Sequence, residues 1–288
     1  MATKSTNAPS IYIAAANEKS AGKSTVMNVL ADMLRETSSL VHLFDPDGTN
    51  GSFLKRQGTR DDAGNLLRDQ DPAVGCVGYD LATDGSRDTF VNCLEVTPKP
   101  KVILADNGAK SLENLKKIID NGEGVSGLLD VIDEQGFKLT LMHVASNLTE
   151  STASIRSYMK AFGDRANHVV VLNKHYGSNL APLNVKSEDI PESDWGKSDF
   201  PWWFGHKDPE SGEKLGFRTR DELLAMGGVE IAFPAMQPGI YSRLMATNLT
   251  FSEAAKSKRF TLAERKNIQT FINEGRAAFM TVKDKLGL

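Results

Sequence analysis

Gly22, Lys23, Ser24 and Thr25 stand together in a spacing that suits the binding of a chain of phosphates. A glycine lets the backbone approach a phosphate, a lysine supplies charge toward the β- and γ-phosphates, and the Ser24 hydroxyl can ligate Mg²⁺. The residues lie between an apolar run at 11–16 and a helical pattern at 25–36. A strand leading directly into a helix aims backbone N–H groups and the positive helix end at one anion. We therefore predict a phosphate-binding loop, the alternative being an accidental Gly-Lys-Ser at a helix start.

The first position of this loop departs from the usual pattern G-x-x-x-x-G-K-[ST], because Asn17 stands where that pattern has glycine. Asparagine is among the few residues that tolerate a positive φ, so the loop geometry can survive the change. The expected ligands are ATP and Mg²⁺. The residues expected to contact the nucleotide in the loop are Asn17, Lys19, Ser20, Ala21, Gly22, Lys23, Ser24 and Thr25.

The length and composition of the chain limit the classes of protein to which it can belong. With 288 residues and 40% hydrophobic content, the chain can form one large α/β domain or two small ones. No apolar run reaches membrane-spanning length, and residues 1–10 lack the apolar core of a signal peptide, so we expect a cytoplasmic protein with no membrane segment. Cys76 and Cys93 lack metal-site spacing and are interpreted as buried or half-buried thiols. The net charge of −3 argues against a protein that is basic overall and coats nucleic acid.

Short apolar runs alternate with helical patterns along most of the chain, which predicts a doubly wound, mostly parallel sheet with helices on both faces. The expected strands are 11–16, 40–45, 101–106, 138–145, 168–173 and 229–234, and the expected helices are 25–36, 112–135 and 151–162. We predict a single domain, residues 1–288, with an insertion at 184–219 that carries all three tryptophans. The apolar spacing after 261 predicts a C-terminal helix at about 261–285.

Polar residues follow three further strands, at the sheet edge where ligands of open α/β sheets bind. Asp45 and Asp47 follow the second strand, where an acid can orient an attacking water or reach Mg²⁺. A turn rich in Asp, Pro and Gly explains this composition equally well. Asp106 ends the third strand, as in a Walker B carboxylate that helps to hold Mg²⁺. Asn173 ends a later strand with a donor and an acceptor that suit an adenine edge, and a turn cap is the alternative.

These features, in this order, resemble the MinD/ParA group of P-loop ATPases, which carry a deviant Walker A loop. The resemblance implies that Asp47 activates the hydrolytic water, that Asp106 is the Walker B residue and that Asn173 contacts adenine. It also implies that the segment around Pro234 closes over the base. Lys23 and Asp47 are thus the expected catalytic residues, and Ser24, Asp106 and Asp45 the expected metal ligands. Three stretches, 44–53, 106–109 and 249–254, look more narrowly like the TraL-type ATPases of conjugative plasmids.

One position departs from the group. A signature lysine that reaches across a dimer interface to the partner's phosphates is replaced here by Glu18, and Lys19 follows one residue later. If Lys19 takes over that contact, an ATP-dependent homodimer is expected. If it does not, the cross-subunit contact is missing.

The leading functional hypothesis is a Mg²⁺-dependent ATPase, slow and stimulated by a partner, that acts as a switch in plasmid conjugative transfer or partition. The alternative is an ATP-dependent biosynthetic enzyme similar to dethiobiotin synthetase, and a third is a nucleotide-binding assembly subunit without turnover. Aromatic residues at 195–204 suggest a docking site for a protein of the transfer or partition machinery, with packing of the insertion as the equal alternative. Cations after 250 could touch DNA, although a solvated helix face explains them more simply.

Overall fold

The central feature of the structure is a seven-stranded sheet in which every pairing is parallel. The computed structural model describes residues 8–16, 21–38, 40–48, 51–109, 111–194 and 196–288. Within them the strand order is β3-β2-β4-β1-β5-β6-β9. The strands are β1 (Ser10–Ala15), β2 (Val41–Asp45), β3 (Val77–Gly78), β4 (Val102–Ala105), β5 (Lys138–Ala145), β6 (Asn167–Asn173) and β9 (Val229–Phe233). The doubly wound parallel architecture predicted from the sequence is confirmed, and β3 is an edge strand that the pattern did not predict.

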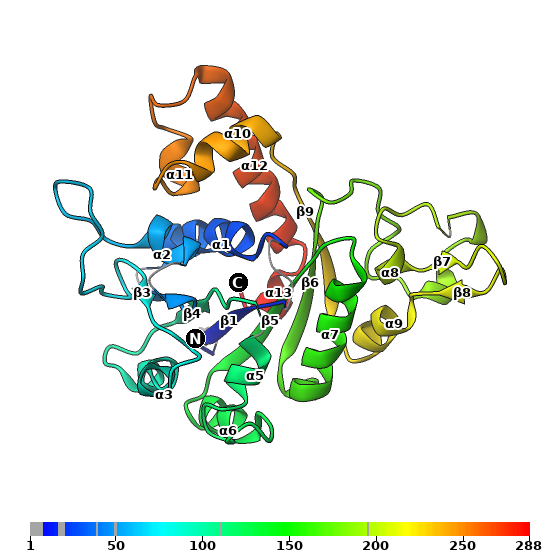
Figure 1. Ribbon diagram of the computed structural model, residues 1–288, viewed down its shortest axis with the longest axis horizontal. Coiled ribbons are helices and arrows are strands. Elements are labelled where there is room, and N and C mark those ends of the chain that lie inside the picture. The colour runs from blue at the N-terminus through cyan, green and yellow to red at the C-terminus, as the bar shows by residue number, and fades with distance from the viewer. Residues whose placement is uncertain (1–7, 17–20, 39, 49–50, 110, 195) are drawn as a thin grey trace, which may run out of the picture.

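The strands are apolar on both sides because helices cover both faces of the sheet (Figure 1). One face packs on α1 (Lys23–Thr37) and α12 (Leu262–Met280), whose side chains share a core with β1 residues such as Tyr12. The other face packs on α6 (Ser126–Glu134) and α7 (Thr149–Phe162), together with Phe90 and Leu94. The remaining elements on these two faces are α2 (Ser52–Gln57), α3 (Asp84–Arg87), α4 (Thr89–Asn92), η2 (Cys93–Glu95), α5 (Ser111–Leu115), η3 (Gly163–Arg165) and α13 (Lys283–Leu286). None of the helices within the described ranges is long and apolar enough to cross a bilayer.

The prediction of one continuous helix at 112–135 is wrong. The chain forms α5 and α6 instead, with a turn between them. Asn121 and Gly122 have φ values of 50° and 94° in that turn, and two successive left-handed residues cannot continue a right-handed helix. Both cysteines are free and buried.

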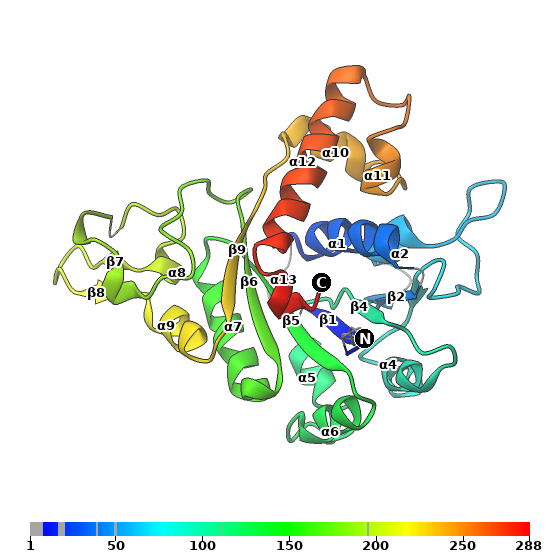
Figure 2. The ribbon, with the colours of Figure 1, turned by 180° about the vertical axis from the view of Figure 1, so that it is seen from behind.

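The C-terminal helices rise from the sheet beside α1 (Figures 1 and 2). They are α10 (Pro238–Met245), α11 (Phe251–Ala254) and α12. Thr250 and Thr261 each form a capping box, with Glu253 and Glu264 respectively, which fixes where α11 and α12 begin. Two buried residues of α2 help to hold these helices against the sheet. Arg56 donates a hydrogen bond to the Leu249 carbonyl. Gln57 donates to the Asp32 carboxylate, which also accepts from Ser252 N at 2.9 Å.

The chain between β6 and β9 forms a lateral lobe against α7 (Figure 1). It contains η4 (Ser187–Asp189), η5 (Glu192–Asp194), α8 (Pro201–Phe204), the antiparallel pair β7 (His206–Lys207) and β8 (Lys214–Leu215), and α9 (Arg218–Ala225). The lobe has a core of its own, which includes Phe200, Trp203, Phe204 and Leu223.

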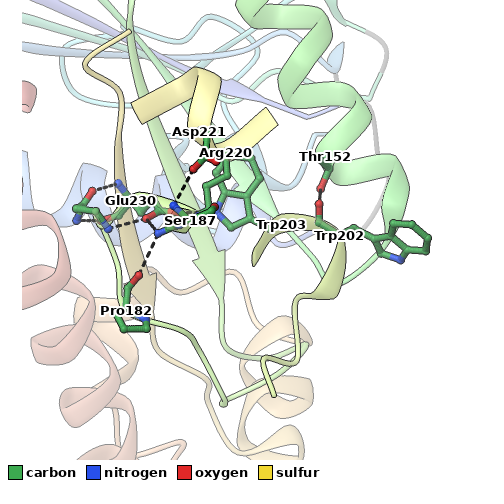
Figure 3. A network of polar contacts seen from close by, with 9 residues as sticks. Thr152, Pro182, Ser187, Trp202, Trp203, Arg220, Asp221 and Glu230 are labelled. Atoms are coloured by element: carbon green, nitrogen blue, oxygen red, sulfur yellow. Dashed lines mark hydrogen bonds and ion pairs between the residues drawn. The ribbon is translucent and has the colours of Figure 1, made fainter. Parts of the chain in front are cut away.

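A buried carboxylate on β9 anchors this lobe (Figure 3). Glu230 is fully buried and accepts from Arg220 Nε at 2.7 Å, Arg220 Nη2 at 2.9 Å and Trp203 Nε1 at 2.6 Å. Asn184 donates its backbone N–H to Glu230 Oε2 at 2.6 Å. Its side-chain amide also pairs with the backbone of Glu230, accepting from N at 2.7 Å and donating to O at 3.0 Å.

The interpretation of 195–204 as an exposed aromatic segment is therefore wrong for Trp203, which is 2% exposed and part of the lobe core. Its neighbour Trp202 is 41% exposed, and its ring makes a T-shaped contact with the His206 ring. Trp195 lies outside the described residues. Only Trp202 of the two described rings is available to another molecule.

Two buried histidines link β5 and β6. His168 Nε2 lies 2.8 Å from the Gly163 carbonyl oxygen, which can only accept, so this nitrogen carries the proton. The Nδ1 atom of a neutral His168 therefore accepts from His143 Nε2 at 2.9 Å. Burial lowers the pKa of both imidazoles. The positive charge of a protonated His168 lowers the pKa of His143 further.

We expect this pair to make stability fall in mild acid. Both pKa values are lower in the folded protein than the unfolded value of about 6.5, so below that pH the unfolded chain binds more protons than the folded one. The free energy of unfolding is therefore unaffected by these groups above about pH 6.5 and decreases as the pH falls below it. The slope is up to about 1.4 kcal/mol per pH unit for each histidine. Urea unfolding of the parent and of a His143→Gln, His168→Gln variant between pH 7.5 and 5 isolates this slope, because all other groups are common to both. Equal slopes would contradict it.

Candidate functional site

The described end of the turn between β1 and α1 places Gly22 in a conformation and a packing that suit glycine alone. Gly22 is the N-cap of α1 and has φ 94°, a left-handed conformation that glycine adopts without strain. A Cβ at this position would also lie 2.4 Å from Asn173 Nδ2, so there is no room for a side chain. The loop is held from the opposite side, because Asn173 donates to the Ala21 carbonyl at 2.9 Å. Asn17, Glu18, Lys19 and Ser20 lie outside the described residues.

An acidic compartment of about 390 Å³ lies at the carboxyl ends of β2 and β4. It brings together five residues singled out from the sequence, and its described lining is Lys23, Ser24, Asp45, Asp47, Ser52, Asp106, Asn107, Gly108 and Ala109. The end of the loop and the acids at the carboxyl ends of β2 and β4 thus lie at one edge of the sheet.

Asp106 is the most perturbed acid of this compartment. Burial, then the negative charge of Asp45, raises its pKa to about 7, while a hydrogen bond from Ser24 and the charge of Lys23 act in the opposite direction. Its Oδ1 atom and the neighbouring Asn107 Nδ2 are buried without a hydrogen-bond partner among the described residues. A buried carboxylate oxygen left unpaired is costly, so this position suits a cation or a hydrogen-bond donor brought by a ligand.

Asp45 holds the following segment in place. Its Oδ2 accepts from Leu54 N of α2 at 2.7 Å and its Oδ1 from Asp47 N, in the turn after β2, at 3.2 Å, so both oxygens are engaged with backbone groups. Burial raises its pKa to about 6 against the lowering effect of these bonds. The carboxylate therefore positions α2 and is less suited to direct metal ligation than Asp106.

Asp47 is exposed and faces the loop after β4. A Cβ added to Gly108 would lie 2.8 Å from Asp47 Oδ1, which shows how closely the carboxylate approaches that loop. The side chain lines the acidic compartment together with Lys23 and Ser24. This is a place from which a carboxylate can accept a proton from water.

The residues present suit a single Mg²⁺ ion. Within the described part of the chain, no group of three or more His, Cys, Asp or Glu side chains is placed to hold a metal ion by itself. Mg²⁺, however, is commonly held by one or two protein oxygens, by waters and by the phosphates of its nucleotide. Ser24 Oγ and Asp106 would supply the protein oxygens, and the unpaired Oδ1 of Asp106 is the observation that favours the ion.

A larger, mainly apolar cavity of about 520 Å³ adjoins the acidic compartment. The two share Lys23, Ser24 and Ser52 in their linings, so they meet at the start of α1. Thr25, Asn173 and Pro234, which are predicted from the sequence to contact the nucleotide, line the larger cavity. Asn173 Nδ2 already donates to Ala21 O, and its Oδ1 accepts from His175 N at 3.1 Å.

Sequence reasoning missed the far wall of this cavity. Arg56 of α2, Tyr241 and Met245 of α10, Phe251 of α11 and Phe271 of α12 line it. They stand more than 30 residues from the loop along the chain, and their apolar or basic character resembles that of ordinary helix faces. Only the packing of the C-terminal helices on α1 reveals them.

The strand order, the parallel pairing and the Gly-Lys-Ser turn between β1 and α1 define the fold class of the P-loop NTPases. No protein-family model matches the chain, and no curated protein matches it. Among solved structures, the chain is similar to the MinD cell division protein of Aquifex aeolicus, with 12% identity, coverage of 94% of this chain and 96% of that chain, and a TM-score of 0.46. McdA of Cyanothece in complex with ATP shows 12% identity, coverage of 98% and 97%, and a TM-score of 0.46.

A nucleotide-binding protein of Archaeoglobus fulgidus in complex with ADP shows 13% identity, coverage of 83% of this chain and 87% of that chain, and a TM-score of 0.39. The fold class rests on the strand order and register of this chain itself.

Proposed function

We propose that the protein is a Mg²⁺-dependent ATPase whose nucleotide state controls its association with a partner. The single observation that carries the proposal is the meeting of two unlike compartments at Lys23 and Ser24. One is acidic, with the unpaired Asp106 oxygen, and suits a metal-bound phosphate. The other is mainly apolar and suits a base and ribose. A nucleoside triphosphate has these two ends joined by a chain of phosphates.

The position of Asp47 in the lining of the acidic compartment supports hydrolysis of the terminal phosphate. In the proposed reaction the carboxylate orients a water and Lys23 stabilises charge on the phosphates. Ser24 and Asp106 would hold Mg²⁺, which would offset the repulsion between the phosphates. We further propose that the switch serves plasmid conjugative transfer or partition, on the strength of the sequence stretches that resemble TraL-type ATPases. Trp202 is the exposed ring through which a protein partner would dock.

The direct test is ATP hydrolysis by the purified protein with Mg²⁺, alone and with DNA, carboxylic acid metabolites or candidate partner proteins. Stimulation by a protein or by DNA supports the switch, whereas consumption of a carboxylic acid together with ATP would support the biosynthetic alternative. Light scattering with ADP and with a non-hydrolysable ATP analogue reports an ATP-driven dimer. Lys19→Ala should block that dimer while sparing nucleotide affinity if Lys19 makes the cross-subunit contact.

We expect Asp47→Ala to retain ATP binding and to lose turnover by about 100-fold or more, the scale usual for a positioned proton acceptor. Because Asp47 is exposed, its substitution should change the free energy of unfolding little. Single-turnover hydrolysis and calorimetric ATP binding on the same preparation measure the two quantities. Asp69→Ala, in the exposed loop before β3, is the matched control. Turnover equal to that of the parent would leave Asp47 as a turn residue.

A further inference from the structure

A hydrogen bond joins the start of α1 to the C-terminal helices at the wall of the larger cavity. Thr25 Oγ1 and the Tyr241 hydroxyl lie 3.0 Å apart, although 216 residues separate them in the chain. Both side chains line the cavity and both are half-buried. Thr25 does not line the acidic compartment. Its hydroxyl therefore faces the end of the site that would hold the base and the phosphate next to it.

The direction of this bond decides what Thr25 can do. Each hydroxyl has one proton and can also accept. If the Tyr241 phenol donates to Thr25 Oγ1, the only Thr25 proton is left to point into the cavity, where an anion is the favourable acceptor. If Thr25 donates to Tyr241, its oxygen turns lone pairs toward the anion. A bound phosphate therefore selects the first arrangement.

Tyr241 stands on a firmly held element. Ile240 and Leu244, its neighbours on α10, are buried in the core shared with α1, and Arg56 Nη2 reaches the Leu244 carbonyl at 3.5 Å. The His175 ring lies 6.3 Å from the Tyr241 ring, centroid to centroid. The phenol is thus placed by packing from several sides, which is what a group that orients another needs.

We propose that Tyr241 is a positioning residue for nucleotide binding: its phenol donates to Thr25 Oγ1 and so directs the Thr25 proton at the phosphate nearest the base. The inference rests on the proposed nucleotide site. Because that phosphate is present in both ADP and ATP, the two nucleotides depend on Tyr241 equally. The terminal phosphate is handled elsewhere, so turnover at saturating ATP does not depend on it.

A double-mutant cycle tests this. Tyr241→Phe keeps the ring and removes the hydroxyl, and Thr25→Val keeps the shape and removes the acceptor. We expect Tyr241→Phe to weaken ADP and ATP binding alike by about 3- to 10-fold, the scale of one oriented hydrogen bond, with kcat at saturation unchanged. In the Thr25→Val background the same change should have no effect on affinity.

An equal loss in both backgrounds would overturn the proposal, because it would show that the Tyr241 hydroxyl acts independently of Thr25. Unchanged affinity of Tyr241→Phe would overturn it as well. Ser242→Ala, an exposed neighbour on α10, is the control for the helix, and the melting temperature of each variant reports folding. A parent protein that binds neither ADP nor ATP would instead refute the proposed function, and the positioning role with it.

Discussion

Lys23→Ala is expected to weaken ATP binding by about 10- to 100-fold, the scale of losing hydrogen bonds between a charged group and its partner. Lys23 is 9% exposed and lines both compartments, so its ammonium lies where the phosphates must cross from one to the other. Its charge also lowers the pKa of Asp106, which shows that it acts within the acidic compartment. Isothermal titration calorimetry with ATP and Mg²⁺ measures the change.

Lys55→Ala is the matched control, since Lys55 is an exposed lysine of α2 that lines neither compartment. It should bind ATP as the parent does. A Lys23→Ala protein with full affinity for ATP would refute the assignment of the phosphate loop, because no other lysine lines the described part of either compartment.

Trp203→Ala is expected to destabilise the protein by about 3 to 5 kcal/mol, as truncation of a large buried ring does. The substitution empties the core of the lateral lobe and removes the Nε1 donor at 2.6 Å from Glu230. Glu230 then keeps its ion pair with Arg220, but it has lost one of the donors that compensate its burial. Urea unfolding followed by circular dichroism measures the loss.

Trp202→Ala is the paired control, because the adjacent ring is 41% exposed and its removal should change the free energy of unfolding by less than about 0.5 kcal/mol. Trp203→Phe separates the two causes, since it fills part of the volume but cannot donate to Glu230. Equal stability of Trp202→Ala and Trp203→Ala would contradict the packing described here.

Strand positions could be predicted because fully apolar runs such as Val169 to Leu172 leave few alternatives to a central parallel strand. The site could be predicted as far as short-range chemistry extends, namely the Gly-Lys-Ser turn and the acids that directly follow strands. The buried ion pair of Arg220 and Glu230 could not be predicted, because a charged residue in a strand is normally assigned to the solvent-facing side unless its partner is known. The same holds for Tyr241, whose contact with Thr25 depends on how α10 packs.

The break between α5 and α6 shows a different limit. Apolar residues at 112–135 keep a helical spacing across the break, so periodicity alone does not reveal it. The local conformation of Asn121 and Gly122 decides the outcome, because one stable left-handed turn ends a helix whatever pattern follows.

The Asn184 side chain gives the outer strand of the sheet a property of its own. An edge strand normally offers free N–H and C=O groups on which an extended chain can add itself. On β9 the two groups of Glu230 are already occupied by the carboxamide of Asn184, at 2.7 and 3.0 Å. A foreign strand would have to displace both bonds and expose a buried carboxylate. Addition of a foreign strand is therefore disfavoured at the middle of this edge, where both backbone groups of Glu230 are already bonded.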